Sequence, residues 1–433
     1  MSTSESRNND AEKRLVRKLD LTILPLFTMI YTFIYVDRSS LGNAQVAGMP
    51  NDLRLKNYDL SISMTVFFVI YAIMKIPSSL VVKHLGSTWI AVLIIGAGFT
   101  ALGTAFTTDS MGLLLTRLFL ALVEGGIGAG FVYLLARDLW ARKYYRRNEL
   151  VLRIITIGLG LLGLVFLPGD PSTTKLLTQA ERELAIERID LDSAVKTEGT
   201  REKTSLKLVL RSFNVWTCLC TFCFFVLSIS YQAMNVFLPT ILSKVGHLSA
   251  SQAQLDTVPI FIAGAVWGLL SSYASFRWKN RAIPTLLGGL LHVIGYSLVI
   301  NSSSFSQRYA ACVMIYMGDC AVGILIMTWA TDNAAPDTMR AVAAAAVPGL
   351  GSLGSIVGMW VFVPSEAPEF RVGNMLNLIS GVIMVFSIAL GTLYLKAENS
   401  KRERGDRDDR LLGLARDEAI SLGYRHPGFR YQT

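Results

Sequence analysis

Charged residues are scarce in this sequence. Only 17% of its 433 residues are Asp, Glu, Lys or Arg, whereas 52% are hydrophobic, and the mean hydropathy is +0.44. This composition argues against a protein built around one soluble core. The formal net charge of +9 does not require a nucleic-acid partner, because most Lys and Arg residues lie between apolar segments or near the ends of the chain.

Cysteine and histidine are also rare, with five and four residues. Residues two apart on a helix face different directions, so Cys218, Cys220 and Cys223 do not form a metal-ligand set, and no disulfide framework is indicated. The stretch GGIGAG (125–130) follows no strand pattern and indicates close helix packing instead of a phosphate loop. With no nucleophile motif or nucleotide loop, we expect neither an enzyme nor a bound cofactor or metal.

The abundant apolar residues form eleven blocks, most of them about 20 residues long, which is the length a helix needs to cross a bilayer. Helices satisfy their own backbone hydrogen bonds in lipid, so the sequence predicts an all-α, polytopic membrane protein. The blocks cover residues 20–40, 60–82, 88–107, 111–136, 151–167, 213–238, 256–275, 282–300, 309–331, 341–363 and 374–395.

The blocks divide the chain into two unequal halves. We expect an incomplete N-terminal bundle (1–168), a cytoplasmic central loop (169–211), a six-helix C-terminal bundle (212–395) and a cytoplasmic tail (396–433). Counting membrane crossings from the basic N-terminus and from the charged tail places the central loop on opposite sides. Either a span is missing near Arg153 and Ile154, or the short fifth block enters the membrane without crossing it.

Ionisable residues inside predicted spans are the strongest functional signal. A charge in hydrocarbon costs roughly 3 kcal/mol on insertion scales, so such residues usually line a polar cavity or pair with one another. Arg117 and Glu124 are two helical turns apart and therefore share one helix face. Asp37 and Arg38 close the first block. An acid and a base on each of two helices suit a path for a proton and an anion.

Polar residues also interrupt the apolar blocks of the C-terminal half. Gln232, Asn235 and Asn333 are candidates for substrate contacts, and Trp329 shares a helix face with Asn333. Hydrogen bonds between helices are the alternative interpretation. Two further mid-block acids, Asp319 and Asp332, have no role that the sequence assigns, and His292 is interpreted as a hydrogen-bonded core residue.

Several stretches resemble the major facilitator superfamily, in particular the anion:cation symporters of the fungal allantoate permease group. The resemblance covers about 90% of the chain. It is carried by YTFIYVDRSSLGNA, FFVIYAIMKIPSSLVVKHLGSTW, TRLFLALVEGGIGAGFVYLLARDLW, LPGDPSTTKLLTQAERELA, FLPTILSKVGHLSASQAQLDTVP, RYAACVMIYMG, WATDNAAPDTMRAVAAA and GLGSLGSIVGMWVFVPSEAPEFRVGN.

Two departures from the family pattern stand out. The family places a fifth span and the start of the sixth between ELVLR and IITIGLG, so the resemblance implies about eleven spans where relatives have twelve. We interpret the gap as a skipped exon or an imperfect gene model. Lys75 stands where relatives often carry an acid or a small polar residue, which leaves its partner open.

The resemblance implies a role for each candidate residue. Asp37 and Glu124 would carry the proton, Arg117 would hold a substrate carboxylate, and Arg38 would couple the two. Aromatic residues of the cavity would be Tyr35 and Tyr71. Structural salt bridges between the first and fourth spans are the alternative.

The implied function is proton-coupled symport of a small carboxylate nutrient such as allantoate, ureidosuccinate, nicotinate or pantothenate. We expect a monomer in a lipid bilayer, most simply the plasma membrane, with both termini in the cytoplasm. A transport-dead truncated form or a membrane nutrient sensor is the alternative, which the missing span favours.

Overall fold

The computed structural model describes the helical regions of the chain. The described residues are 41, 44, 49–56, 58–85, 87–136, 206–302, 304–335, 337–362, 369–411 and 422–433. They contain helices and turns and no strand, and eight of their helical segments are long and apolar enough to cross a membrane. The predicted all-α membrane fold is confirmed.

The described residues of the N-terminal half form three long helices and one short one. These are α2 (Met49–Asp52), α3 (Asp59–Leu85), α4 (Ser87–Thr104) and α5 (Ser110–Ala136). They coincide with the predicted blocks 60–82, 88–107 and 111–136. The blocks 20–40 and 151–167, most of the central loop and the proposed gap after Arg153 lie outside the described residues.

The C-terminal half contains six spans, one of them interrupted. Its helices are α8 (Leu206–Arg211), α9 (Val215–Gly246), α10 (Ala250–Trp278), α11 (Ala282–Asn301), α12 (Phe305–Asp332), α13 (Asp337–Gly351), α14 (Gly354–Val361) and α15 (Arg371–Glu403), followed by the short turns η3 (Asp408–Leu411) and η4 (Gly423–Arg425). The block 341–363 is two helices, α13 and α14, separated by Ser352 and Leu353. The boundary expected at residue 395 falls inside α15, which continues to Glu403.

Local capping explains where two of these helices begin. Asn214 accepts a hydrogen bond from the backbone N–H of Thr217 at the start of α9, and Ser249 forms a capping box with Gln252 at the start of α10. These caps satisfy backbone N–H groups that have no partner within the helix.

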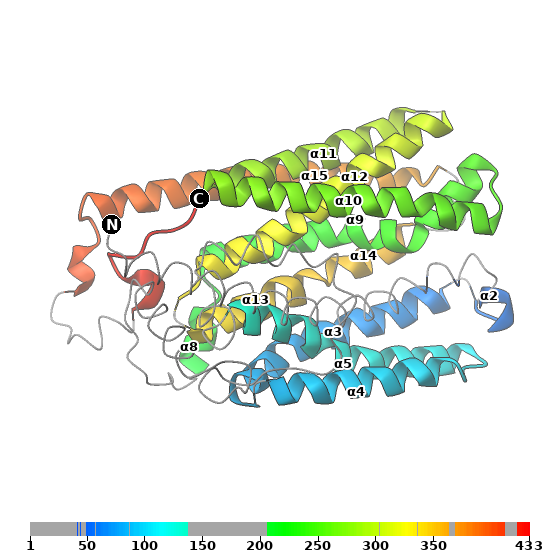
Figure 1. The fold of residues 1–433 in the computed structure, drawn as a ribbon, viewed down its shortest axis with the longest axis horizontal. Coiled ribbons are helices and arrows are strands. Elements are labelled where there is room, and N and C mark those ends of the chain that lie inside the picture. The colour runs from blue at the N-terminus through cyan, green and yellow to red at the C-terminus, as the bar shows by residue number, and fades with distance from the viewer. Residues whose placement is uncertain are drawn as a thin grey trace, which may run out of the picture.

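Helices α13 and α14 join the two halves of the molecule (Figure 1). α13 packs against α3, α5 and α9, and α14 packs against α9 and α3. Glycine allows the close approach to α9, because a Cβ atom on Gly354 would lie 1.9 Å from the carbonyl oxygen of Phe225, and one on Gly358 would lie 2.3 Å from that of Ile229.

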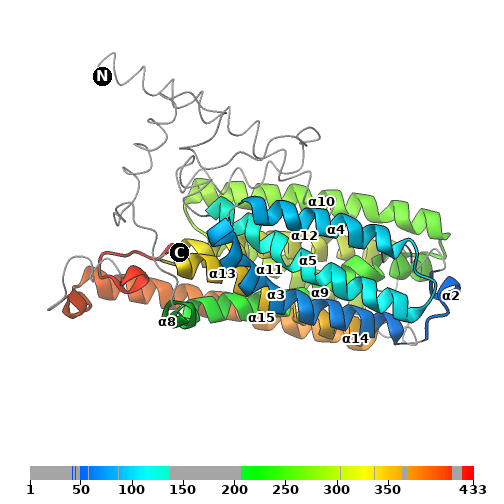
Figure 2. The same ribbon diagram turned by 90° about the horizontal axis from the view of Figure 1, so that it is seen from below.

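The long helices run roughly in one direction, so the molecule has two ends (Figures 1 and 2). We call the end that carries α8 and residues 422–433 the tail end, and the opposite end the α2 end. Figure 2 shows α3, α4 and α5 lying side by side along the same axis as α9 and α10.

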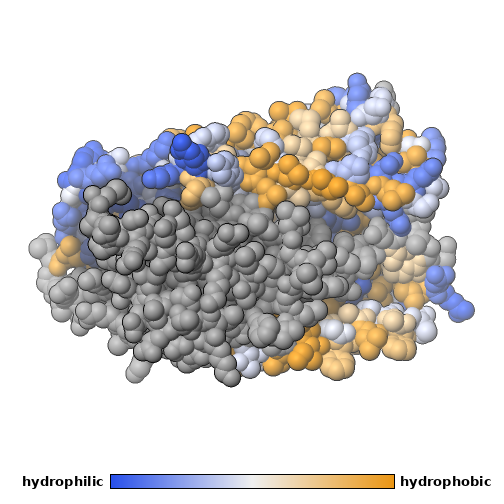
Figure 3. Space-filling model, in the orientation of Figure 1, coloured by the Kyte–Doolittle hydropathy of each residue, from blue (hydrophilic) through white to orange (hydrophobic). Residues whose placement is uncertain are grey.

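The outer surface of the helices is apolar between the two ends. Figure 3 shows a hydrophobic band over the C-terminal half, with hydrophilic residues gathered at the ends. This band is the surface that lipid chains would contact. Large exposed hydrophobic residues line the outer faces of α4 (Val92, Ile95, Phe99, Leu102), α10 (Leu255, Ile262, Val266, Leu270), α11 (Ile283, Leu287, Leu290, Ile294) and α15 (Ile379, Val382, Phe386, Leu393).

Candidate functional site

Four polar side chains of α3 and α5 are buried in the N-terminal half. Tyr71, Lys75, Arg117 and Glu124 are between 2% and 6% exposed. Tyr71 and Lys75 lie one turn apart on α3, while Arg117 and Glu124 lie two turns apart on α5, a rise of roughly 10 Å. We call these four residues the α3–α5 polar group. Three of them were predicted site residues.

Glycine brings α5 close to α3 beside Glu124. A Cβ atom on Gly125 would lie 2.9 Å from the carbonyl oxygen of Tyr71, and one on Gly126 would lie 2.0 Å from Oγ of Ser78. The predicted use of GGIGAG in close helix packing is therefore confirmed at these two positions. The contact places Glu124 at the level of Tyr71, near the middle of both helices.

Lys75 lies where the N-terminal half meets α13. Its Nζ is 4.2 Å from the centroid of the Tyr71 ring, a cation–π distance. A Cβ atom on Gly349 of α13 would lie 3.1 Å from Cδ of Lys75, so the lysine stem fills the space beside that glycine. The sequence had left the partner of Lys75 open, and Tyr71 provides one.

An apolar cluster joins the two halves on the α2 side of Glu124. We call it the cross-half cluster. Phe237 of α9 stacks on Phe362 with ring centroids 5.8 Å apart, and Phe362 contacts Phe370 at 5.5 Å. Helices α3 and α5 contribute Phe67 and Leu120. The buried members are Leu41, Met64, Phe67, Phe68, Tyr71, Leu120, Ala121, Ala233, Val236, Phe237, Met359, Phe362 and Phe370.

Polar contacts reinforce this closure at the α2 end. The indole N–H of Trp360 donates to Oγ1 of Thr65 at 3.0 Å, and the Trp360 ring stacks on Tyr58 with centroids 5.6 Å apart. The described parts of the two halves are therefore in direct contact between the level of Glu124 and this end of the molecule.

The charges of the α3–α5 polar group favour an anion. Lys75 and Arg117 are cations, and Glu124 is the one acid among the four residues, so the group sums to one positive charge when Glu124 is ionised. A charge buried in a low-dielectric interior acts more strongly than one in water. Asp37, Arg38 and Tyr35, the other predicted members of the site, lie outside the described residues.

Two predicted site residues, Gln232 and Asn235, lie on α9. Asn235 contacts another helix of the C-terminal half, and Gln232 is buried. Asn235 donates from Nδ2 to the backbone oxygen of Tyr231 at 2.8 Å and accepts from Oη of Tyr316 on α12 at 3.4 Å. Gln232 is buried one residue before Ala233 of the cross-half cluster. Asn235 thus makes the interhelical bond that the sequence offered as an alternative.

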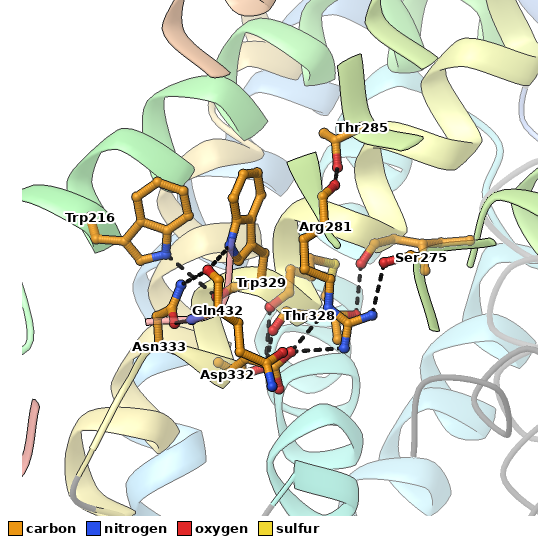
Figure 4. Close-up of polar contacts among 12 residues, drawn as sticks. Trp216, Ser275, Arg281, Thr285, Thr328, Trp329, Asp332, Asn333 and Gln432 are labelled. Carbon is orange, nitrogen blue, oxygen red and sulfur yellow. Dashed lines mark hydrogen bonds and ion pairs between the residues drawn. The ribbon is translucent and has the colours of Figure 1, made fainter. Parts of the chain in front are cut away.

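Trp329 and Asn333 lie at the tail end, where they bind the last residues of the chain (Figure 4). The backbone oxygen of Gln432 accepts from Nε1 of Trp329 at 2.7 Å and from Nδ2 of Asn333 at 3.1 Å. The backbone N–H of Gln432 donates to Oδ1 of Asn333 at 2.8 Å. The sequence predicts that Trp329 and Asn333 contact substrate together with the α3–α5 polar group. In the structure they bind Gln432 at the tail end instead.

The rest of the tail is held by α15. Asn399 binds both backbone groups of Tyr431, each at 2.9 Å. Arg402 donates to the backbone oxygens of Phe429 and Tyr424, and its guanidinium lies 4.4 Å from the centroid of the Tyr431 ring. Residues 422–433 therefore form a folded cover over the tail end of the C-terminal half. No sequence pattern signals this cover, because each of these bonds joins residues far apart in the chain.

Two acids of α12 that the sequence left without a role have charged or ionisable partners. Asp332 accepts from Nε and from the terminal nitrogen Nη2 of Arg281 at 3.2 and 3.0 Å, and both residues are buried (Figure 4). Asp319 contacts His292. His292 is therefore hydrogen-bonded, in agreement with its interpretation from sequence.

Comparison with known proteins agrees with this architecture. Residues 149–359 match the family model described as Major Facilitator Superfamily. The human organic anion transporter MFSD10 superposes with a TM-score of 0.53 at 12% identity, over 87% of this chain and 99% of that one. A bacterial homologue of the lysosomal transporter Spinster superposes with a TM-score of 0.51 at 14% sequence identity, over 88% of this chain and 95% of that one. The chain has the major facilitator fold.

The relatives in sequence include fungal transporters. An uncharacterized transporter of Schizosaccharomyces pombe is 27% identical over 94% of this chain and 89% of its own length. The high-affinity nicotinic acid transporter of Saccharomyces cerevisiae is 25% identical over 98% of this chain and 86% of its own length. These similarities support a multi-pass membrane protein that acts in transport. Both alignments, over 457 and 470 residues, are longer than this 433-residue chain, so each relative contains residues without a counterpart here.

Proposed function

We propose that this protein is a secondary active transporter that moves a small organic anion together with a proton. The observation that carries the proposal is the α3–α5 polar group, in which two cations and one acid are buried on α3 and α5 and Lys75 packs against Gly349 of α13. Buried ionisable residues in a membrane protein mark substrate or ion pathways. The surplus of positive charge favours an anion, and Glu124 provides a group that can take up a proton.

Each residue of the group has a distinct chemical role in this proposal. Arg117 binds the substrate carboxylate, because a guanidinium donates two parallel hydrogen bonds in a geometry that lysine cannot reproduce. Glu124 carries the proton, together with Asp37, while Arg38 couples the two events. Tyr71 lines the cavity, and Lys75 adds a second positive charge beside it.

In the alternating-access mechanism that we propose, the site opens in turn toward each side of the membrane. Transporters of this kind bind substrate near the midplane and rock one bundle against the other. The cross-half cluster closes the route from Glu124 toward the α2 end. We assign the tail end to the cytoplasm of a plasma-membrane transporter, since Arg residues gather there: Arg211, Arg281, Arg402, Arg404, Arg407, Arg410, Arg425 and Arg430.

A small carboxylate is the proposed substrate class. The similarity to a named nicotinic acid transporter supports it, as does the charge of the polar group. Nicotinate, pantothenate, allantoate and ureidosuccinate are the compounds to test. The transporter acts as a monomer, since one chain contains both halves of the fold.

Uptake of labelled carboxylates by yeast cells that lack their own permeases would test the proposal. The test uses a version in which the corresponding segment of a relative is inserted between Arg153 and Ile154. Arg117→Lys should weaken substrate binding by about 1–3 kcal/mol, because a point charge replaces a bidentate fork. Glu124→Gln should leave binding measurable and abolish accumulation driven by a pH gradient. Accumulation by Glu124→Gln against a substrate gradient would show that Glu124 does not carry the proton.

The 433-residue chain itself should transport little or nothing. A first bundle that lacks one helix leaves apolar surfaces of its neighbours uncovered and opens the cavity that Arg117 and Glu124 line. In the same yeast strain, the chain should fail to restore growth on carboxylates that the restored version supports. A transport-dead protein or a nutrient sensor would bind substrate without accumulating it. Robust uptake by the 433-residue chain would show that the missing segment is dispensable.

A further inference from the structure

Five buried polar side chains meet in the middle of the C-terminal half. They come from four helices: Ser230 from α9, His292 and Tyr296 from α11, Asp319 from α12 and Asn377 from α15. None is more than 1% exposed. Each lies more than one helical turn from the ends of its helix, so the cluster lies within the bundle.

Asp319 is at the centre of this cluster. Its Oδ1 lies 2.6 Å from Nδ1 of His292, and its Oδ2 accepts from Oγ of Ser230 at 2.8 Å. Oγ of Ser230 lies 2.7 Å from Oη of Tyr296, which in turn accepts from Nδ2 of Asn377 at 3.1 Å. Both oxygens of the carboxyl group are therefore hydrogen-bonded.

The other ring nitrogen of His292 determines where the protons are. Nε2 lies 3.2 Å from the backbone oxygen of Asn377, and a carbonyl oxygen only accepts, so Nε2 carries a hydrogen. A neutral imidazole with a hydrogen on Nε2 has a lone pair on Nδ1. If Asp319 were ionised at the same time, that lone pair would face an oxygen lone pair at 2.6 Å, which is repulsive. One further proton must lie between Nδ1 and Oδ1.

We infer that His292 and Asp319 form a proton-binding site in the C-terminal half. The site holds one proton, either on His292 as an imidazolium beside a carboxylate or on Asp319 as a carboxylic acid beside a neutral imidazole. In both forms the pair has no net charge. Loss of the proton would leave one uncompensated negative charge in the apolar interior, which is strongly unfavourable.

The surroundings of the pair offer no other compensating charge. Among the described residues, no hydrogen bond or ion pair joins Asp319 to Lys or Arg. The titratable neighbours are Tyr296 on α11 with Cys312 and Cys320 on α12, and all three are neutral in their protonated forms. The groups that face the pair from α9 and α15 are Ser230 and Asn377, which do not titrate. The proton is therefore the charge that balances Asp319.

Close packing fixes the imidazole ring. A Cβ atom on Gly318 would lie 2.8 Å from the backbone nitrogen of His292, and one on Gly381 of α15 would lie 2.4 Å from Cδ2 of its ring. Both glycines let α12 and α15 pack directly against His292, so the state of the pair and the packing of α11, α12 and α15 are coupled.

This site is distinct from Glu124 and does not rest on the proposed transport activity. It can be observed by nitrogen-15 NMR of the purified full-length chain with labelled histidine. The other three histidines, His84, His247 and His426, are replaced by Gln so that one imidazole remains. We expect the Nδ1 signal of His292 in the folded chain to be that of a nitrogen that bears or shares a proton. The signal of an unprotonated Nδ1 in the folded chain would overturn the proposal.

Two variants sharpen the test. In Asp319→Asn the amide nitrogen can donate to Nδ1, so His292 becomes neutral and the Nδ1 proton is lost. Ser230→Ala is the control, because it removes only the second hydrogen bond of Asp319 and should leave the Nδ1 proton in place. Retention of that proton in Asp319→Asn would disprove the site. If Asp319→Asn fails to fold, the unsubstituted chain and Ser230→Ala still decide the question.

Discussion

The two halves of the molecule use buried charge differently. In the C-terminal half, Asp332 pairs with Arg281 and Asp319 pairs with His292, each within the six-span bundle. In the N-terminal half, Lys75 lies against Gly349 of α13, which packs between the halves, and Glu124 lies at the same depth as Tyr71. Asp319 and Asp332 are thus paired inside their own bundle, whereas Lys75 is a buried charge that contacts the opposite half.

This difference has an energetic reason. In the proposed transport cycle, a buried pair within one bundle keeps its partners while the two halves move. A charged group at the contact between the halves would instead change its surroundings. Such a group can respond to a substrate or a proton, because its environment differs between the two arrangements.

The largest expected effect concerns the pair at the tail end of α12. Asp332→Asn should destabilise the folded chain by about 3–5 kcal/mol, because it leaves the guanidinium of Arg281 buried without its counter-charge. Thermal unfolding in detergent would measure this loss. Glu369→Gln is a matched control, since Glu369 is 56% exposed and pairs with Arg308 at 3.2 Å, and it should cost less than about 1 kcal/mol. Equal effects would show that burial does not distinguish the two pairs.

The second-largest loss of stability should come from a substitution at the contact between α9 and α14. Gly358→Ala places a methyl group against the backbone oxygen of Ile229 and should destabilise by about 1–3 kcal/mol. Gly98→Ala on α4 is the control, because no atom lies within 4 Å of the added Cβ, and it should be neutral or stabilise by up to about 1 kcal/mol. The same unfolding measurement checks both. A neutral Gly358→Ala would mean that α14 can move away from α9 without loss.

Docking of the tail should depend on Asn333. Asn333→Ala removes both side-chain bonds to Gln432 and should weaken docking of residues 422–433 by about 1–2 kcal/mol. Limited proteolysis within the tail would reveal its release as faster cleavage. Asn301→Ala is a suitable control, since its amide donates only to Ser297 of its own helix. Unchanged cleavage in Asn333→Ala would show that the tail is held by its other contacts.

The smallest expected effect is a pH dependence of the same docking. Burial raises the pKa of the Tyr431 phenol, so the docked tail keeps this group neutral where a released tail would ionise. The docked form then binds more protons above about pH 10, and docking should weaken as the pH rises through that range. Proteolysis at increasing pH should show this for the unsubstituted chain and not for Tyr431→Phe. An identical profile in Tyr431→Phe would assign the effect to another group.

Much of the fold was predictable from the sequence. The apolar blocks coincide with α3, α4, α5 and the helices of the C-terminal half, because bilayer thickness requires about 20 apolar residues and helix hydrogen bonds are local. One block was not a single helix. The interruption at Ser352 and Leu353 lies between glycines that approach α9, a requirement of packing that composition does not reveal.

The candidate site was predictable only in part. Arg117, Glu124 and Tyr71 stand out in the sequence because they interrupt or border apolar runs. All three are buried, Tyr71 on α3 and the other two on the neighbouring helix α5. Trp329 and Asn333 have the same sequence signature, and yet they bind Gln432 at the tail end. A polar residue in an apolar block predicts burial with a partner, and it does not say which partner.

The sequence by itself determined that this chain is a bundle of membrane-spanning helices, because helix formation and hydrophobic length are properties of contiguous residues. Only the tertiary structure decided which polar groups meet. His292 and Asp319 are 27 residues apart, and Asn333 and Gln432 are 99 apart. Their contacts exist because α11 packs on α12 and the tail folds back over the tail end, and such packing depends on the fit of whole helices rather than on any local pattern.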